Sequence, residues 1–255
     1  MKLSIVVPAY NEERRLGRML SEYLAYFEPR HGADFELVVS VNGSTDRTEE
    51  IARDLAAAHP AVQVVVEPAA IGKGGAVIGG GKTARGELIG FTDADGSTPP
   101  EAFDALVDEI GEADFISANR WMEESVVEPR QPLKRRVSSR VFNTLVRILF
   151  KVRTSDTQCG AKLMKREAWE KVMPTLDITR WAFDVDLMFK ARRAGLSFKE
   201  VPTVWRDRDG SKIHYFRSSL EMLLSLGRLR LIYSPFKFVV DAYDWMNDHF
   251  SLREK

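Results

Sequence analysis

Short apolar runs alternate with helix-like segments along the first half of the chain. Five runs predict buried strands, at residues 3–7, 36–41, 62–66, 88–92 and 114–118. Between the first two runs, apolar residues at helical spacing form one face: Leu16, Met19, Leu20, Tyr23, Leu24 and Phe27. Such alternation predicts an α/β fold with a mostly parallel central sheet flanked by helices on both faces.

Turn and capping residues mark the ends of these elements. Pro8 is expected to close the first strand, and Asn11 to cap a helix that begins with Glu12 and Glu13. A second helix, with Ile51 and Leu55 facing inward, is expected after the turn at residues 42–46.

A glycine-rich segment at residues 72–83 contains AVIGGGKT, a loose match to a phosphate-binding loop. A true loop of this kind needs a helix that starts at its Lys-Thr pair, and here Gly86 and the next strand follow too soon. We therefore reject a nucleoside-triphosphatase. Instead we expect a helix over about residues 75–85 that packs tightly on the sheet, with Lys73 just before its N-terminal end.

Polar loops follow three of the strands, at residues 8–12, 42–46 and 93–98. In a parallel sheet these loops share the edge where ligands bind. Asp93 and Asp95 lie in the third loop, followed by Gly96 for a sharp turn and by Pro99-Pro100, which opens a helix. Two adjacent carboxylates repel one another unless a cation lies between them. The pair indicates Mg²⁺ or Mn²⁺ held together with substrate phosphates, against the alternative of a solvated acidic turn.

The second half of the chain is basic and amphipathic. Residues 130–153 carry eight cations and no acid, and apolar residues recur there at helical spacing. A helix over residues 133–153 therefore indicates binding to a membrane surface or to a phosphorylated ligand, although a core-packed helix with a basic solvent face fits the pattern too. A further helix is expected at residues 216–231, followed by a break at Ser234-Pro235 and an aromatic tail. We divide the chain into a catalytic domain (1–212) and a helical tail (213–255).

Composition excludes several features but does not by itself indicate a function. The chain has 255 residues, 44% hydrophobic and 29% charged, with a formal net charge of zero. A single cysteine, Cys159, excludes internal disulfides, fits a reducing compartment and is expected to be buried. No run approaches the roughly 20 apolar residues that span a bilayer. The expectation is a cytoplasmic protein, peripheral on a membrane, with no nucleic-acid partner. The four scattered histidines give no support to a histidine metal site or triad.

Several motifs in order resemble one family. Pro8-Ala9-Tyr10-Asn11-Glu12, Asn42-Gly43-Ser44-Thr45-Asp46, Gly72-Lys73-Gly74 and Asp93-Ala94-Asp95 resemble the inverting family 2 glycosyltransferases with the glycosyltransferase A fold. Later segments are similar to the dolichyl-phosphate glucosyltransferase branch of that family, and less so to the mannosyltransferases: residues 156–163, 180–185 and 210–212.

The resemblance implies a role for each matching residue. Nucleotide and phosphate contacts are implied for Pro8, Tyr10, Glu12, Asn42, Asp46, Lys73, Asp93, Arg120, Arg140, Arg208 and Lys212. Metal binding is implied for Asp93 and Asp95, and roles at the sugar and the reacting centre for Asp156, Gln158, Trp181 and Asp184. The chain departs from the pattern at Asn42, where the family usually has Asp, and at Ser97, where the mannosyltransferases carry Gln.

The resemblance thus predicts a metal-dependent hexosyltransferase that moves glucose from UDP-glucose to a polyprenyl phosphate with inversion. GDP-mannose as donor, or a soluble acceptor, are the alternatives within the family. A nicotinamide-dependent oxidoreductase needs a G-x-G-x-x-G turn after the first strand, where this chain has Pro8-Ala9-Tyr10-Asn11-Glu12. A catalytically idle binding protein is disfavoured by the presence of both Asp93 and Asp95. The number of subunits stays open.

Overall fold

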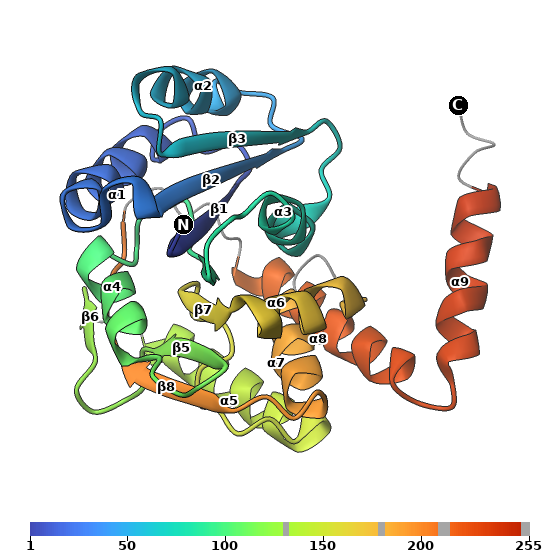
Figure 1. Cartoon of the computed structure of the whole chain (residues 1–255). Coiled ribbons are helices and arrows are strands. Elements are labelled where there is room, and N and C mark those ends of the chain that lie inside the picture. The colour runs from blue at the N-terminus through green and yellow to red at the C-terminus, as the bar shows by residue number, and fades with distance from the viewer. Residues whose placement is uncertain (130–132, 178–181, 209–214, 251–255) are drawn as a thin grey trace.

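A computed structural model of the chain describes residues 1–129, 133–177, 182–208 and 215–250 (Figure 1). Its centre is a seven-stranded sheet with the order β3-β2-β1-β4-β7-β5-β8. Its strands are β1 (Leu3–Ala9), β2 (Phe35–Asn42), β3 (Val62–Glu67), β4 (Leu88–Phe91), β5 (Phe115–Asn119), β7 (Lys162–Lys165) and β8 (Phe198–Pro202). Neighbouring strands are parallel except at β7, which runs antiparallel to both β4 and β5.

Helices cover both faces of this sheet, as Figure 1 shows. One layer contains α1 (Leu16–His31), α2 (Thr48–Ala58) and α4 (Pro100–Glu109). The other contains α3 (Gly72–Gly81), α5 (Leu133–Phe150), α6 (Arg166–Val172), α7 (Phe183–Arg193) and α8 (Tyr215–Ile232). The chain also forms α9 (Lys237–Phe250), the short helices η1 (Gly32–Asp34) and η2 (Met173–Thr175), and a small sheet of β6 (Val126–Glu128) with β9 (Val204–Arg206).

Alternation along the central strands separates the two apolar cores. In β1, Leu3, Ile5 and Val7 face the α1 layer, whereas Val6 faces the α3 layer. Because both faces are covered, each residue of β1 and β2 is buried. This explains why these strands appear in the sequence as continuous apolar runs.

The five predicted strands are confirmed, with small shifts at their ends. The largest shift concerns Pro8, which does not close β1, since the strand continues to Ala9 and pairs Pro8 with Ser40. Pairing with β4 has already ended at Val6. Val6 and Pro8 turn their backbone groups to the same side, so the missing N–H of Pro8 faces the side that β4 has left.

The predicted start of α1 is wrong. Asn11 caps no helix: its φ is +54°, and α1 begins five residues later at Leu16. The segment from Glu12 forms a turn instead, and two of its backbone N–H groups donate to side chains between β2 and the start of α2. Glu12 N donates to Thr48 Oγ1 (2.7 Å) and Glu13 N to Asp46 Oδ2 (3.1 Å). The apolar face of α1 is buried as predicted.

The glycine-rich segment forms α3, which starts at Gly72 rather than near residue 75 and ends at Gly81. The helix therefore ends before the Lys-Thr pair, which confirms the rejection of a phosphate-binding loop. Its glycines allow the close packing that we expected. A Cβ on Gly80 would lie 2.7 Å from Val6, and one on Gly81 would lie 2.1 Å from the ring of Trp169.

The second half contains the predicted helices and several strands that the pattern does not reveal. The helix expected over 133–153 is α5 and ends at Phe150, while the helix expected at 216–231 is α8. Leu226 and Leu229 of α8 are buried in the core of the α3 layer. Strands β6, β7, β8 and β9 were not predicted. Within the described ranges, no helix combines the length and apolarity needed to cross a bilayer.

Candidate active site at the carboxyl edge of the sheet

The loops after β1 and β2 are joined by hydrogen bonds at the carboxyl edge of the sheet. Asn11 Oδ1 accepts from Thr45 N (2.9 Å), and Asn11 N donates to Ser44 Oγ (3.2 Å). Burial would raise the pKa of Asp46, but hydrogen bonds from Thr48 and from the Glu13 amide hold it below its usual value. The two loops thus form one rigid wall that keeps Asp46 ionised.

The loop after β4 presents the two aspartates. Gly96 has a φ of +69°, which permits the sharp turn, and Ser97 N donates to Asp95 Oδ1 (2.8 Å). Burial, together with the charge of Asp93, raises the pKa of Asp95. The two carboxylates therefore lie close enough to repel one another, as the sequence predicts.

Arg15 and Glu12 lie beside these aspartates. The Arg15 guanidinium donates to both carboxylate oxygens of Glu12, at 2.6 Å each. Burial raises the pKa of Glu12, and the charges of Asp95 and Asp93 add to this effect. Arg15 was not predicted as a site residue, and its charge partly offsets this local excess of negative charge.

A chain of alternating charges crosses the site from Asp93. Lys73 Nζ, at the start of α3, lies 2.8 Å from Asp93 Oδ1 and 3.5 Å from Asp184 Oδ2. The other oxygen of Asp184 lies 2.7 Å from Lys162 Nζ. Burial would raise the pKa of Asp184, but the charges of Lys162 and Lys73 lower it. Asp184 is therefore an ionised carboxylate held between two ammonium groups.

Lys162 fixes the preceding loop as well as Asp184. It is fully buried at the start of β7, and its ammonium donates to the carbonyls of Thr157 and Cys159. The same loop presses against Asp93 through Gly160, where a Cβ would lie 2.0 Å from Asp93 Oδ2. Because β7 is antiparallel, its first residue lies at the same edge as the last residue of β4: Lys162 pairs with Phe91.

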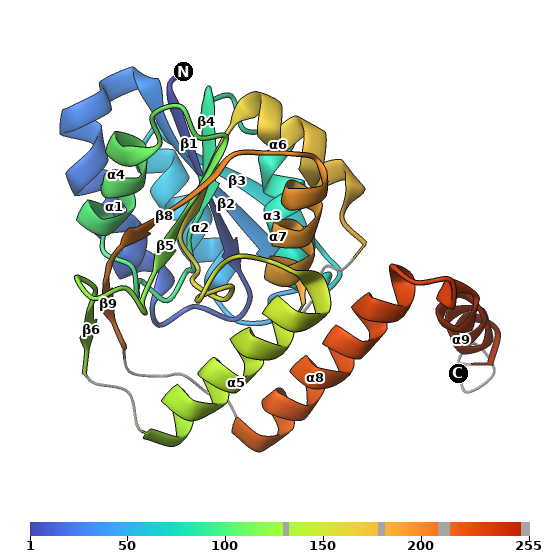
Figure 2. The same ribbon diagram turned by 90° about the horizontal axis from the view of Figure 1, so that it is seen from below.

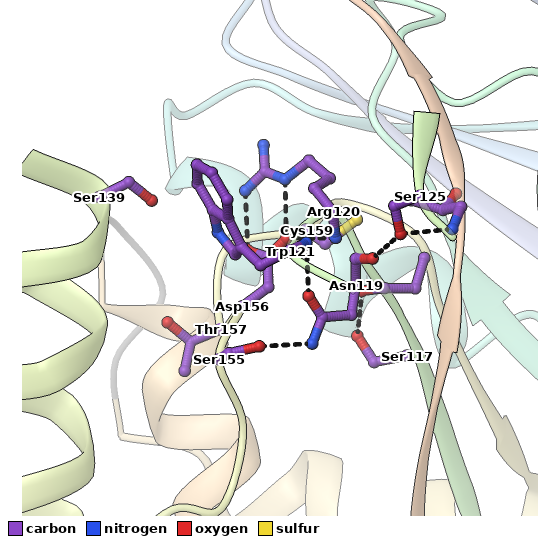
Figure 3. A network of polar contacts seen from close by, with 12 residues as sticks. Ser117, Asn119, Arg120, Trp121, Ser125, Ser139, Ser155, Asp156, Thr157 and Cys159 are labelled. Atoms are coloured by element: carbon purple, nitrogen blue, oxygen red, sulfur yellow. Dashed lines mark hydrogen bonds and ion pairs between the residues drawn. The ribbon is translucent and has the colours of Figure 1, made fainter. Parts of the chain in front are cut away.

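Arg120 and Asp156 form a second buried ion pair, shown in Figure 3. Arg120 Nε and Nη2 each donate to one oxygen of Asp156 at 2.8 Å, and Arg120 N donates at 3.0 Å. Asp156 is 0% exposed. Burial would raise the pKa of Asp156, but Arg120 lowers it. Asn119 supports the pair by accepting from Trp121 N and donating to Ser155 and Glu200.

A cavity of about 360 Å³ opens beside this ion pair, between α5 and the segment that follows β5. Three arginines line it, with an indole ring and a hydroxyl: Arg120, Arg136, Arg140, Trp121 and Ser125. The guanidinium of Arg140 lies 5.6 Å from the Trp121 ring centroid. Asp156 neutralises Arg120, but no described acid pairs with Arg136 or Arg140. We call this space the arginine pocket. Its excess of positive charge suits an anion such as a phosphate.

The remaining predicted residues fall in different places. Tyr10 is 53% exposed, Pro8 is buried within β1, and the amide of Asn42 donates to Ala9 O (3.1 Å). Cys159 is buried, as expected. Gln158 lies in the loop held by Lys162, and its Nε2 is buried with no partner among the described residues. Trp181 and Lys212 lie outside the described residues.

Arg208 does not join the arginine pocket. It donates to both carboxylate oxygens of Glu22 on α1, at 2.9 and 2.7 Å. It lines a separate cavity of about 390 Å³ behind the Asp95 turn, where it lies near Gly96. Its guanidinium is therefore already neutralised, unlike those of Arg136 and Arg140.

The two aspartates bear on whether a divalent metal can bind at this site. The described residues contain no preformed group of three or more His, Cys, Asp or Glu side chains that could hold a metal ion. Asp93 and Asp95 supply two carboxylates, and their mutual repulsion favours a cation shared with a phosphorylated ligand. The residues present therefore suit a metal that arrives together with a diphosphate.

The comparisons with known proteins identify the family. The model of the family "Glycosyl transferase family 2" matches residues 4–173. A dolichyl-phosphate beta-glucosyltransferase of Trichomonas vaginalis is 36% identical over 222 residues, which cover 83% of this chain and 68% of that protein. The enzyme of the same name from Mus musculus is 36% identical over 250 residues, covering 91% of this chain and 76% of that protein.

Solved structures show the same fold. Glucosyl-3-phosphoglycerate synthase from Mycobacterium tuberculosis, in complex with Mn²⁺, UDP and phosphoglyceric acid, superposes with a TM-score of 0.65. It is 18% identical, and the match covers 88% of this chain and 77% of that one. The family match and the curated relatives together confirm the resemblance seen in the motifs. This chain belongs to glycosyl transferase family 2 and has the glycosyltransferase A type of fold.

Proposed function

We propose that this chain transfers a hexose, glucose from UDP-glucose, to a polyprenyl phosphate with inversion at the anomeric carbon. The names of the curated relatives support the glucosyl donor and the dolichyl-phosphate acceptor. The UDP and Mn²⁺ bound to the mycobacterial synthase support a uridine nucleotide and a divalent metal.

One observation carries the choice of acceptor. Each of the two carboxylates at the reacting centre is already engaged by cations: Asp156 by Arg120, and Asp184 by Lys162 and Lys73. Their pKa values are lowered, so both are weak bases. A hydroxyl acceptor needs a base to remove its proton, whereas a phosphate monoester is already ionised near neutral pH. The ion pairs of Asp156 and Asp184 therefore favour a phosphate as the nucleophile.

The mechanism follows from where the charges lie. Asp93 and Asp95 would hold the metal, which supplies a positive charge for the diphosphate that leaves. Lys73 lies within 2.8 Å of Asp93, so its ammonium can stabilise the same developing charge. Arg136 and Arg140 would hold the acceptor phosphate in the arginine pocket. A phosphate oxygen of the acceptor attacks the anomeric carbon as the bond between that carbon and the β-phosphate oxygen of UDP breaks. UDP departs with the electron pair of the broken bond.

The roles of the loop residues are also part of this proposal. Asp156 orients Arg120 at the wall of the arginine pocket and stays ionised throughout. Gln158 carries a buried amide nitrogen with no partner among the described residues, and we assign it to a sugar hydroxyl. Asp184 positions the sugar rather than removing a proton. Glu12, Asp46 and Tyr10 lie on the donor side.

The test uses a prenyl phosphate short enough to stay dissolved and the matching prenyl alcohol. With UDP-glucose and Mn²⁺ we expect glucosylation of the phosphate but not of the alcohol, detected by mass spectrometry. Transfer to the alcohol, or turnover with GDP-mannose alone, would contradict the proposal. Arg140→Gln should raise the acceptor KM and leave the affinity for UDP unchanged. Arg147→Gln is the matched control, since it lies on the same helix outside the arginine pocket.

A further inference from the structure

Large apolar side chains remain exposed on three helices of the second half. Ile148 of α5 is 67% exposed, Leu224 of α8 is 65% exposed and Phe238 of α9 is 64% exposed. In the part of the chain that the structure describes, the exposed large apolar residues outside these helices and the link between α8 and α9 are Tyr10 and Val126. We call the exposed apolar faces of α5, α8 and α9 the three-helix surface.

These helices are neighbours in space. Figure 2 shows α5 and α8 side by side below the sheet, with α9 projecting from the end of α8 and away from the body. In α5, Val137, Val141 and Ile148 recur at spacings of four and seven and so share one side of the helix. Phe142 and Val146, on the other side, are buried in the core. The outward apolar stripe of α5 is therefore additional to its core-facing stripe.

The charge around α5 has one sign. Residues 130–153 hold eight cations and no acid in a chain whose net charge is zero. Arg147 is exposed and has no described acidic partner. Helix α9 also carries an exposed acid, Asp241. Tyr243 and Met246 project from the other side of the helix, so α9 can bury these two side chains while Asp241 stays in water.

We propose that the three-helix surface docks on a lipid bilayer that contains anionic lipids. Apolar side chains flanked by arginines, with aromatic residues such as Phe236 and Trp245, match the interfacial region of such a bilayer. A second copy of the chain fits less well, because a symmetric contact would bring the basic α5 helices of the two copies together.

Docking would also affect the reaction, and this consequence rests on the proposed function. Arg136 and Arg140 of the arginine pocket belong to α5, the helix that would lie on the bilayer. A lipid phosphate could then reach the pocket from the headgroup layer while its chains stay in the membrane. Docking itself does not depend on which sugar is transferred.

The test is co-flotation with vesicles of phosphatidylcholine, alone or mixed with phosphatidylserine, that contain no acceptor lipid. We expect binding to the anionic vesicles, weakened by salt. The double variant Phe236→Ser/Phe238→Ser should partition at least about tenfold less well, since two exposed aromatic side chains are lost. Arg147→Gln should reduce the preference for phosphatidylserine. Val126→Ser, an exposed apolar residue on β6, is the matched control and should bind like the parent.

Three results would overturn the proposal. The first is a lack of binding to anionic vesicles, and the second is binding that the double variant does not change. The third is a dimer, measured by sedimentation velocity, that the double variant dissociates; the surface would then be a contact between copies. Activity on the dissolved prenyl phosphate separates these failures from failure of the proposed function, because that assay contains no membrane.

Discussion

Gly160→Ala tests the position of Asp93, because the glycine lies directly against its carboxylate. A Cβ at residue 160 would lie 2.0 Å from Asp93 Oδ2 and 2.5 Å from its Cγ. Ordinary van der Waals contact begins near 3.4 Å. The carboxylate or the loop must therefore move by about 1.4 Å. Such overpacking costs about 1–3 kcal/mol of stability.

The larger effect is expected on ligand binding. A misplacement near 1 Å at a reacting centre can cost about a hundredfold, and a metal–oxygen contact near 2.1 Å tolerates little shift. At a UDP–Mn²⁺ concentration about 100 times the dissociation constant, ligand stabilises the parent by about 2.7 kcal/mol, and a hundredfold weaker variant by about 0.4 kcal/mol. For a chain of this size, a thermal shift of roughly 5–10 °C would shrink to about 1 °C.

The assay is a thermal melt of parent and variant with and without UDP and Mn²⁺. Gly79→Ala is the matched control, since a Cβ there meets nothing within 4 Å and the residue lies in α3. It should raise the stability by roughly 0.5–1 kcal/mol and keep the full UDP–Mn²⁺ shift. An undiminished shift in Gly160→Ala would refute the assignment of Asp93 to the metal–diphosphate site.

Three further predictions concern the buried charges. Lys162→Met should lower the free energy of unfolding by about 3–5 kcal/mol in urea, because Asp184 loses its closest cation; a loss below about 1 kcal/mol would contradict this. Asp95→Asn should raise the metal-free melting temperature, since it removes a repelling charge, and abolish the UDP–Mn²⁺ shift; an unchanged shift would count against Asp95 as a ligand. Folding lowers the pKa of Asp156 from its unfolded value near 3.8, so the ionised carboxylate stabilises the fold at pH values above 3.8. This stabilisation is lost as the pH falls below 3.8 and through the folded pKa. Asp156→Asn should therefore flatten the acid limb of stability measured against pH, and an unaltered limb would contradict the pairing with Arg120.

The meeting of the loops after β1, β2 and β4 at one edge could be predicted from local sequence, for a physical reason. Strands buried on both faces leave uninterrupted apolar runs, as in β1 and β2, and the polar loops after them must meet at one edge. Asp93 and Asp95 follow such a run directly. The start of α1 was missed because the first turn takes its hydrogen-bond partners from Asp46 and Thr48, more than thirty residues later in the chain.

The part of the site around β7, Asp184 and Arg208 could be predicted less well, because its structure depends on partners that are distant in the sequence. Strand β7 reads Lys-Leu-Met-Lys, and a four-residue segment bounded by lysines does not suggest a central strand. Lys162 can be buried there because Asp184 and two carbonyls compensate its charge. Spacing in the sequence gives no sign of such compensation. Arg208 shows the same limit, since its partner Glu22 lies 186 residues away.

The direction of β7 also bears on how such a protein can diverge. Strand β5 ends at the carboxyl edge, β7 begins there, and Ser117 pairs with Lys162 across the two strands. Residues 120–161 therefore leave the sheet and return to it at nearly the same place. A segment whose two ends are anchored side by side can be lengthened or exchanged without changing the register of the strands in the central sheet. Evolution could in this way replace the arginine pocket while the loops after β1, β2 and β4 keep their architecture.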